Sequence, residues 1–522
     1  MTEPTTPVAT TSERRWLDIP WHPTVFAITI VLAYWLDTVV SPYAAVRAIV
    51  AAAAFGIVLT LGCLAATRSA AWAGVVSTGV LALLYSKHLV DVASVLGGVA
   101  PMWVLALWLV LLLLALALVA RLMRRRIRRM SVRRANRFLN WAAFVYLGAS
   151  VVLAITSGKA GHAIADLTQG EPSLAQSTAD SAATTGPDIY LILVDGYPRE
   201  DVLREAFDFD NAAFLASLDE RGFDVARDSV SAYLWTQQSL ASMLHMDYVE
   251  DIPDFKAVLD GRAARQPTLR DIVNDNPTFD LARREGYEVV ATGYEFEELA
   301  LRQADRYLDP GYLNEFELQL LVSTFAGDIV GTVFPDFAAD QHRAWIESQV
   351  RAPGEIAAST GSVPRLVIGH VSAPHQPTVF GAGGVPVQVP LTSEFYADSP
   401  QERGQPADEF ISRYRAQLPY LNERLLGMVD EILSASSQPP VIVLWADHGS
   451  ASRVDWNVTS TEEASADALR ERTSTLFAAL TPGQRDVFPD DIAPQDIVRY
   501  LADAYFETDL GAAARGEDVS PP

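Results

Sequence analysis

Residues 189–197 read IYLILVDGY, a run of six apolar residues followed at once by an acidic residue and a glycine. A short apolar run rich in branched side chains predicts a buried β-strand. Three similar runs occur later in the chain, YEVVATG (287–293), RLVIGHV (365–371) and PVIVLWA (440–446). Amphipathic stretches predicted to be helices accompany them, at 210–221, 237–244, 410–435 and 494–506. This combination predicts a sheet of the α/β class.

Residues with metal-binding or acid–base capacity follow three of these four strands. Asp195 follows the first strand, His375 comes shortly after the third, and Asp447 with His448 follows the fourth. Ligands of open α/β sheets bind beyond the carboxyl ends of the strands, so we expect these side chains to converge. Two carboxylates and an imidazole form a mixed oxygen and nitrogen site suited to Mn, Mg or Zn. Such a site suits phosphoryl or sulfuryl transfer, which needs a cation to neutralise oxyanion charge.

Thr236 is the candidate nucleophile for this chemistry. It lies in SAYLWTQQSLASMLHMDY, where a turn meets a helical stretch, so its hydroxyl is expected near the positive end of a helix dipole. A purely structural role as a helix N-cap is the alternative. The same caution applies to Asp195-Gly and Asp447-His448-Gly, because such sequences also form ordinary turns.

The first part of the chain has a different composition. Five apolar segments, each able to cross about 30 Å of hydrocarbon, predict a bundle of about five transmembrane helices. They cover residues 24–40, 44–66, 70–85, 102–120 and 138–155. The third segment is short and contains glycine and serine, so a buried or re-entrant piece is the alternative there.

An arginine-rich loop between the last two segments predicts the orientation of the bundle. Residues 121–137 hold nine arginines, which places this loop and the N-terminus in the cytoplasm. Everything after residue 155 is then extracytoplasmic, and the chain is a multi-pass protein of the plasma membrane. A patch for nucleic acid or anionic lipid is the alternative explanation of the loop.

Charge and cysteine content limit the possible partners. Residues 1–160 carry fifteen Lys and Arg against five Asp and Glu, whereas residues 161–522 carry 25 against 59, a net charge of -34. Such an acidic second half repels nucleic acid, so we expect none as a partner. The single cysteine, Cys63, lies in an apolar segment, so a hydrophobic core and no disulfide must hold the exported domain.

Composition also predicts the domain boundaries. Residues 1–160 form the membrane anchor, 161–187 a flexible linker rich in Ala, Ser, Thr and Gly, 188–510 the catalytic domain, and 511–522 a disordered tail.

Several blocks of the second half resemble, in the same order, the sulfatase-like enzymes of the alkaline phosphatase superfamily. The membrane-anchored branch with lipoteichoic acid synthases and phosphoethanolamine transferases is the most similar, and the resemblance covers roughly residues 187–508. The blocks are PDIYLILVDGYPREDVL, FDNAAFLASLDERGFDVARDS, TQQSLASML, HVSAPHQPTVFG, YRAQLPYLNERLLGMVDEIL, VIVLWADHGS and ERTSTLFAAL.

The resemblance implies a fold and a set of roles. The fold is an alkaline phosphatase-like domain with a central mixed sheet. Metal ligands would be Asp195, Thr236, Asp447 and His448, with Thr236 as the transiently phosphorylated nucleophile. His375 would contact the transferred group or protonate the leaving oxygen. Candidate substrate contacts are Arg472, Arg415 and His370, with a structural role for the histidine and surface ion pairing for the arginines as alternatives.

The chain also departs from that family. True sulfatases carry a Cys or Ser in a C-x-P-x-R context, whereas TQQSL stands at this position and Cys63 lies in the membrane half. No clear second ligand set is present, since Asp340 and His342 are the only nearby pair. We therefore expect one metal ion rather than two.

These features favour an extracytoplasmic phosphotransferase or phosphodiester hydrolase acting on a lipid-linked or cell-envelope substrate in contact with the bilayer. The alternatives are a sulfatase-like hydrolase of sulfated or phosphorylated envelope polymers, an inactive envelope-binding or sensor module, and a transporter. The sequence does not set the oligomeric state.

Overall fold

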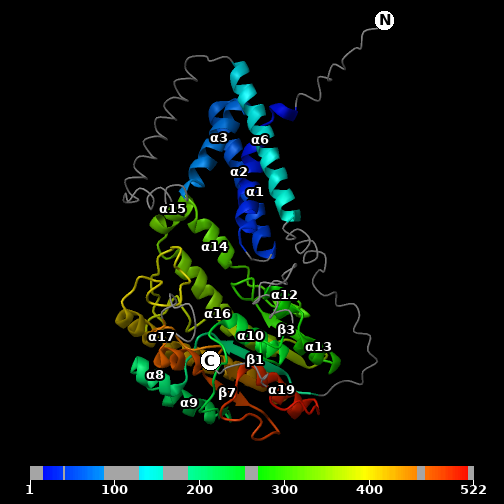
Figure 1. The fold of residues 1–522 in the computed structure, drawn as a ribbon, viewed down its shortest axis with the longest axis vertical. Coiled ribbons are helices and arrows are strands. Elements are labelled where there is room, and N and C mark those ends of the chain that lie inside the picture. Colours follow the sequence, from blue (N-terminus) through cyan, green and yellow to red (C-terminus); the bar gives the residue numbers. More distant parts are fainter. Residues whose placement is uncertain are drawn as a thin grey trace. The chain divides into compact units, whose positions relative to one another are not determined.

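The chain divides into two compact units. The structure, a computed structural model, describes residues 16–38, 42–87, 129–156, 186–252, 269–454 and 465–514. The helical unit comprises Met1–Thr168 together with Phe316–Val333, and the α/β unit comprises Gln169–Glu315 together with Phe334–Pro522. Figure 1 labels the helices and strands of both units. Most of the predicted linker and tail, and the whole 102–120 segment, lie outside the described residues.

Four apolar helices make up most of the described helical unit: α1 (His22–Leu36), α2 (Pro42–Thr67), α3 (Ala70–Leu84) and α6 (Arg129–Thr156). By length and composition, α2 and the Val132–Thr156 part of α6 can cross a membrane. At 15 residues each, α1 and α3 extend only about 22 Å, short of the roughly 30 Å of a hydrocarbon core. The described residues thus give two spanning helices, or three if α14 (Glu315–Val322) and α15 (Phe325–Val333) are one broken span. The count of about five stays a prediction.

A buried histidine joins three of these helices. The backbone N–H of His22, at the start of α1, donates to Asn140 Oδ1 over 3.0 Å. The His22 ring lies 2.6 Å from the hydroxyl of Thr78 on α3 and 3.2 Å from Asn136 Oδ1 on α6. These bonds satisfy polar groups away from water, where an unpaired group is costly, and so fix how the helices pack.

A seven-stranded mixed sheet forms the centre of the α/β unit, in the order β2-β7-β6-β1-β5-β3-β4. Strands β6, β1, β5, β3 and β4 run parallel, and β7 pairs antiparallel with both β6 and β2. All four predicted strands are confirmed, as β1, β3, β5 and β6. The strands are β1 (Ile189–Val194), β2 (Asp224–Val225), β3 (Glu288–Thr292), β4 (Arg306–Leu308), β5 (Arg365–Val371), β6 (Val441–Trp445) and β7 (Phe477–Leu480).

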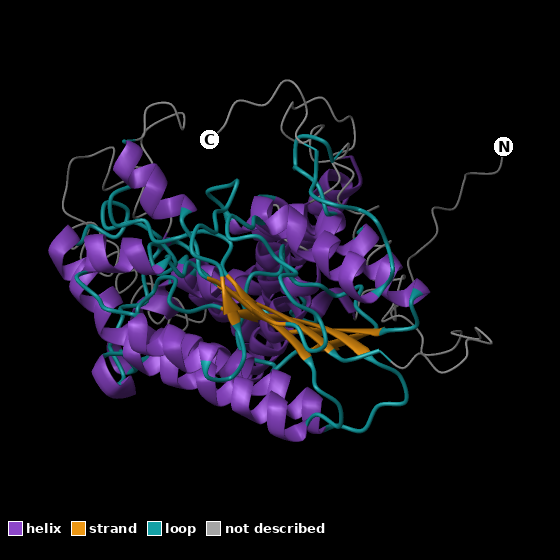
Figure 2. Ribbon diagram, turned by 90° about the horizontal axis from the view of Figure 1, so that it is seen from below, coloured by secondary structure: helices purple, strands orange, loops and turns teal. Residues whose placement is uncertain are grey.

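Helices cover both faces of this sheet (Figure 2). Side chains alternate between the two faces along β1: Ile192 packs into one core cluster and Leu191 into the other. The first cluster includes α8 (Glu200–Phe207), α9 (Ala212–Asp219), α16 (Phe337–Ala358) and α17 (Ala407–Ala435). The second includes α10 (Thr236–His245), α12 (Leu269–Asn274), α13 (Pro277–Arg284) and α19 (Pro494–Tyr505). Because β1 is buried on both faces, it has to be apolar at every position.

The packing of α17 against the sheet provides a stability test. Leu425 is fully buried in the first core cluster, whereas Glu423 on the same helix is exposed. Leu425→Ala should lower the free energy of unfolding by about 2–5 kcal/mol, because it removes buried methyl groups and leaves a cavity. Glu423→Ala should change it by less than about 0.5 kcal/mol. Urea unfolding followed by tryptophan fluorescence measures both; equal effects would contradict the assignment of this core.

Candidate active site

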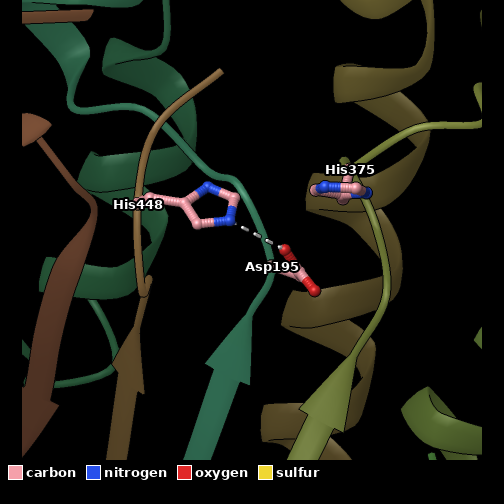
Figure 3. Close-up of side chains that lie close together, drawn as sticks. All are labelled: Asp195, His375 and His448. Carbon is pink, nitrogen blue, oxygen red and sulfur yellow. Dashed lines mark ion pairs between the residues drawn. The ribbon is translucent and has the colours of Figure 1, made fainter. Parts of the chain in front are cut away.

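Three side chains meet beyond the carboxyl ends of the central strands. Asp195 directly follows β1, His375 follows β5, and His448 follows β6. Since β5 and β6 flank β1 in parallel, their carboxyl ends share one edge of the sheet. One ligand atom of each residue lies within 4.8 Å of the others (Figure 3). The predicted convergence of Asp195, His375, Asp447 and His448 therefore occurs.

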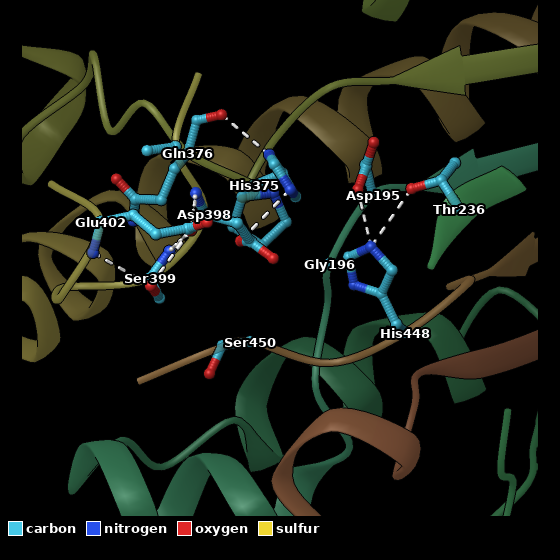
Figure 4. Close-up of polar contacts among 12 residues, drawn as sticks. Asp195, Gly196, Thr236, His375, Gln376, Asp398, Ser399, Glu402, His448 and Ser450 are labelled. Carbon is cyan, nitrogen blue, oxygen red and sulfur yellow. Dashed lines mark hydrogen bonds and ion pairs between the residues drawn. The ribbon is translucent and has the colours of Figure 1, made fainter. Parts of the chain in front are cut away.

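Thr236 joins this group from another part of the chain. It is the first residue of α10, after the extended N-cap residue Trp235. Its hydroxyl oxygen lies 3.2 Å from Nε2 of His448 (Figure 4). Trp235 holds the capping position and the side chain of Thr236 faces the site, so Thr236 is not the N-cap of this helix; its role as nucleophile stays a prediction.

His448 presents a free lone pair to the site. Its Nδ1 lies 2.9 Å from the carbonyl oxygen of Gly449 and donates to it, which leaves Nε2 unprotonated. That Nε2 lies 3.2 Å from Oδ2 of Asp447 and 3.7 Å from Oδ1 of Asp195. Burial and then the charge of Arg472 lower the pKa of His448 to about 3. A neutral imidazole with one nitrogen fixed by a carbonyl is the form that binds metals.

Each of the two buried carboxylates has one oxygen held and one without a hydrogen-bond partner. Asp195 Oδ2 accepts from the hydroxyl of Tyr294 over 2.9 Å and lies 3.0 Å from Nε2 of His370. Asp447 Oδ1 accepts from the backbone N–H of Gly196 over 3.1 Å. The remaining oxygens, Asp195 Oδ1 and Asp447 Oδ2, have no such partner although both residues are almost fully buried.

These free oxygens make the site a good fit for a divalent cation. Burial, and then the negative charge of Asp195, raise the pKa of Asp447. Buried charges are normally paired or coordinate a metal. The donors present are two carboxylates, one neutral imidazole and the hydroxyl of Thr236, a mixed set that suits Mn, Mg or Zn.

His375 differs from His448 in its hydrogen bonds. Its Nδ1 donates to the carbonyl oxygen of Gln376 over 2.8 Å, and its Nε2 lies 3.2 Å from Oδ1 of Asp398. Burial would lower the pKa of His375, but the charges of Asp398 and Asp195 outweigh it and raise that pKa to about 10. With both nitrogens facing acceptors, His375 suits a proton donor or an anion contact better than a metal ligand.

Asp398 is a site residue that the sequence analysis missed. Its Oδ2 lies 2.7 Å from Nη1 of Arg472, and the pKa of Asp398 is lowered because Arg472 and His375 outweigh the cost of burial. Asp398 lies in YADSP, an irregular segment with no strand end or motif to mark it. By contrast, Tyr294 comes two residues after β3. Because ligands bind beyond the carboxyl ends of the strands, its position in the sequence could have identified it.

The three predicted substrate contacts have different surroundings. His370 stacks on Tyr294, with ring centroids 3.7 Å apart, and supports Asp195. Arg472 is only 1% exposed and donates to the carbonyl oxygens of Leu234 and Gly449, so it ties the loops of the site together. Arg415 is half-exposed on α17, and its described contacts are the backbone oxygen of Phe207 and the carboxylate of Asp208. The structure does not bring Arg415 to the group around Asp195.

Asp340 and His342 do not form a shared ligand pair. Asp340 pairs with Arg343 over 2.5 Å, while His342 is buried with its Nδ1 3.0 Å from Oε2 of Glu295. Within the described residues, the one group of three or more clustered metal-ligating side chains is Asp195, His375 and His448.

Comparisons with known proteins give distant structural matches. No family model matches the chain, and no curated protein matches it by sequence. The integral membrane lipooligosaccharide phosphoethanolamine transferase A from Neisseria meningitidis matches at 13% identity and a TM-score of 0.35, over 83% of this chain and 80% of its own. The periplasmic domain of EcEptC from Escherichia coli, in complex with Zn, matches at 12% identity and a TM-score of 0.38, over 62% and 83%.

A sulfatase is among the matches as well. The 2-O GAG sulfatase BT1596 matches at 17% identity and a TM-score of 0.39, over 64% of this chain and 72% of its own. Phosphoethanolamine transferases and sulfatases are the enzyme classes that the sequence blocks resemble. At these identities and scores the function has to be derived from the site itself.

The hydroxyl of Tyr294 provides a test of the carboxylate geometry. Tyr294→Phe removes the donor to Asp195 Oδ2 and should weaken metal binding roughly 10–100-fold, as loss of a group that orients a metal ligand typically does. Tyr505→Phe is the matched control, because that hydroxyl donates to the carbonyl oxygen of Pro482 and takes no part in these contacts. Titration of the metal-free chain with Zn and Mn measures both affinities. Equal affinities for wild type and Tyr294→Phe would contradict the assignment.

Proposed function

We propose that the chain is a metal-dependent phosphotransferase or phosphodiester hydrolase that acts through Thr236 on a lipid-linked or cell-envelope substrate outside the cytoplasm. The position of the Thr236 hydroxyl carries the proposal. It lies 3.2 Å from Nε2 of His448, next to the carboxylates of Asp195 and Asp447, whose inner oxygens are unpaired. An alcohol side chain in this position has the donors of a metal site around it and the N-terminus of a helix behind it.

The roles of the residues follow from their protonation states. A divalent ion held by Asp195, Asp447, His448 and Thr236 would lower the pKa of the hydroxyl and neutralise charge on the phosphoryl group. Thr236 loses its proton to solvent and its oxygen bonds to phosphorus, while the bond from phosphorus to the leaving oxygen breaks. His375 donates its proton to that oxygen, as a cationic imidazole can. An alcohol or water then releases the phosphoryl group from Thr236.

The site speaks against two of the alternatives. A sulfatase that uses formylglycine needs Cys or Ser at the nucleophile position, and Thr236 is neither. An inactive binding module would have no need for a nucleophile, a neutral metal-binding imidazole and a cationic imidazole together. All of these are present within one cluster.

The membrane helices support the proposed location. Two described helices are long and apolar enough to cross a bilayer. The predicted arginine-rich loop continues into the second of them, because residues 129–137 belong to α6. The arginines of residues 121–137 favour a cytoplasmic N-terminus, and the α/β unit is then outside if the chain crosses the bilayer an odd number of times, as the five predicted segments would. A substrate attached to lipid would then be presented at the surface that holds the enzyme.

Replacement of the nucleophile provides the direct test. Thr236→Ala should lower turnover of a chromogenic phosphodiester by roughly a thousandfold or more, since the covalent route is lost. Metal bound to the purified chain, measured by elemental analysis, should remain because three ligands remain. Thr278→Ala, which removes a buried hydroxyl bonded to Leu244, is the control and should keep its turnover. Full activity in Thr236→Ala would disprove the mechanism, and turnover of a sulfate ester alone would favour the sulfatase alternative.

The pH dependence provides an independent test of His375. The proton on His375 is lost as pH rises through its pKa, so the rate should fall at alkaline pH in the wild type. Asp398→Asn removes the charge that holds this pKa near 10, and the alkaline fall should move to lower pH. Asp208→Asn, which removes a fully exposed carboxylate, serves as the control. Identical pH–rate profiles for wild type and Asp398→Asn would rule out the proton-donor role.

A further inference from the structure

An apolar helix pair interrupts the α/β unit in sequence and belongs to the helical unit in space. Helices α14 and α15 lie between β4 and α16 along the chain, yet Phe316–Val333 groups with the membrane helices. The two helices meet at a bend of 99° and together are apolar enough to count as a broken membrane span. Residues 318–327, LQLLVSTFAG, contain no charged side chain.

Specific contacts fix this pair to the helical unit. Phe316 is 3% exposed within a core cluster formed by α1, α2 and α3, and its ring centroid lies 5.5 Å from that of Tyr34. Arg47 on α2 binds Glu317 through two bonds, Nε to Oε1 at 3.0 Å and Nη2 to Oε2 at 2.5 Å. The Nζ of Lys87 lies 2.6 Å from Oδ1 of Asp328 on α15. Both charged groups of the pair that face the bundle are thereby neutralised.

The two basic partners indicate which end of the bundle is involved. Arg47 lies near the first residue of α2, and Lys87 comes three residues after the last residue of α3. Both ends lie on the extracytoplasmic side if the arginine-rich loop is cytoplasmic. The bend of α14–α15 is therefore at the outer surface of the membrane helices.

Apolar side chains on α15 have no cover within the described structure. Ile329 is 58% exposed and Val333 is 59% exposed, on a helix next to α3. On the membrane helices the same pattern occurs, since Val58 on α2 is 67% exposed. Large apolar side chains exposed beside a lipid-facing helix indicate a lipid-facing surface.

We propose that α14–α15 is a re-entrant hairpin that inserts Ile329 and Val333 among the lipids of the outer leaflet. The chain passes between the two units at Glu315–Phe316 and at Val333–Phe334, in addition to the segment after α6. A hairpin inserted in lipid would therefore attach the α/β unit to the bilayer at two further points. Membrane attachment of the α/β unit then does not depend on that segment alone.

Site-directed labelling of the full chain in lipid nanodiscs tests the proposal. In a Cys63→Ala background, which removes the single cysteine, Ile329→Cys and Val333→Cys each carry a polarity-sensitive fluorophore. Matched controls are Val58→Cys on α2 and Val363→Cys in the α/β unit, both exposed apolar positions. Quenching is measured with lipids that carry a nitroxide near the headgroup or deep in the chain, and with iodide in the water.

The expected result is a loss of fluorescence at Ile329 and Val333 with the shallow nitroxide lipid and little loss with iodide. Val58 should respond to the deep nitroxide, and Val363 to iodide alone. Quenching of both hairpin labels by iodide alone would overturn the proposal, because the hairpin would then lie in water. Protection from all three quenchers would also overturn it, because another part of the chain or a second copy would then cover α15. Each labelled variant should retain the metal content of the wild type, which shows that the α/β unit is folded independently of the outcome.

Discussion

The repulsion between two buried carboxylates is the constraint around which the site is arranged. Asp195 and Asp447 follow neighbouring parallel strands, so the pairing of β1 with β6 forces them together. Each carboxylate is fixed through one oxygen, by Tyr294 and His370 in one case and by the backbone of Gly196 in the other. The second oxygens are left facing His448 without partners. A cation bound between these oxygens would offset the repulsion between the two carboxylates.

The charges around the site give its two histidines different protonation states. Their ring centroids lie 5.7 Å apart, yet His448 is neutral and His375 is cationic, with pKa values of about 3 and about 10. Burial disfavours the charge on both rings; at His375 the charges of Asp398 and Asp195 outweigh it, whereas at His448 the charge of Arg472 adds to it. Two like groups with opposite protonation states suit the proposed phosphoryl transfer, with one lone pair for a metal and one proton for the leaving oxygen. Arg472 links these roles, because it binds Asp398 and also the loop that carries His448.

The sequence predicted the parts of the fold that depend on local pattern. The strands β1, β3, β5 and β6 follow from runs of branched apolar residues, and their order along one edge of the sheet places Asp195 and His448 together. Asp398 could not be predicted from a local pattern, because it lies in an irregular segment and contacts His375 only in the folded structure. Helices α14 and α15 were missed for another reason. Each is too short to cross a membrane, the bend divides the apolar run, and Glu317 and Asp328 resemble surface residues until their partners Arg47 and Lys87 are known.

The charge of the second half of the chain bears on how a substrate arrives. Residues 161–522 carry a net charge of -34, which repels phosphate esters in solution, although screening limits this field to roughly 10 Å. Within the site, the charges of His375 and Arg472 lie beside the carboxylates of Asp195, Asp447 and Asp398, so a bound divalent ion would be needed to attract a phosphate ester. In the proposed function the substrate is carried by lipid, and its confinement to the membrane would raise its local concentration without an approach through solution. The acidic surface therefore disfavours the approach of a soluble anionic substrate, which agrees with the proposal of a substrate held in the membrane.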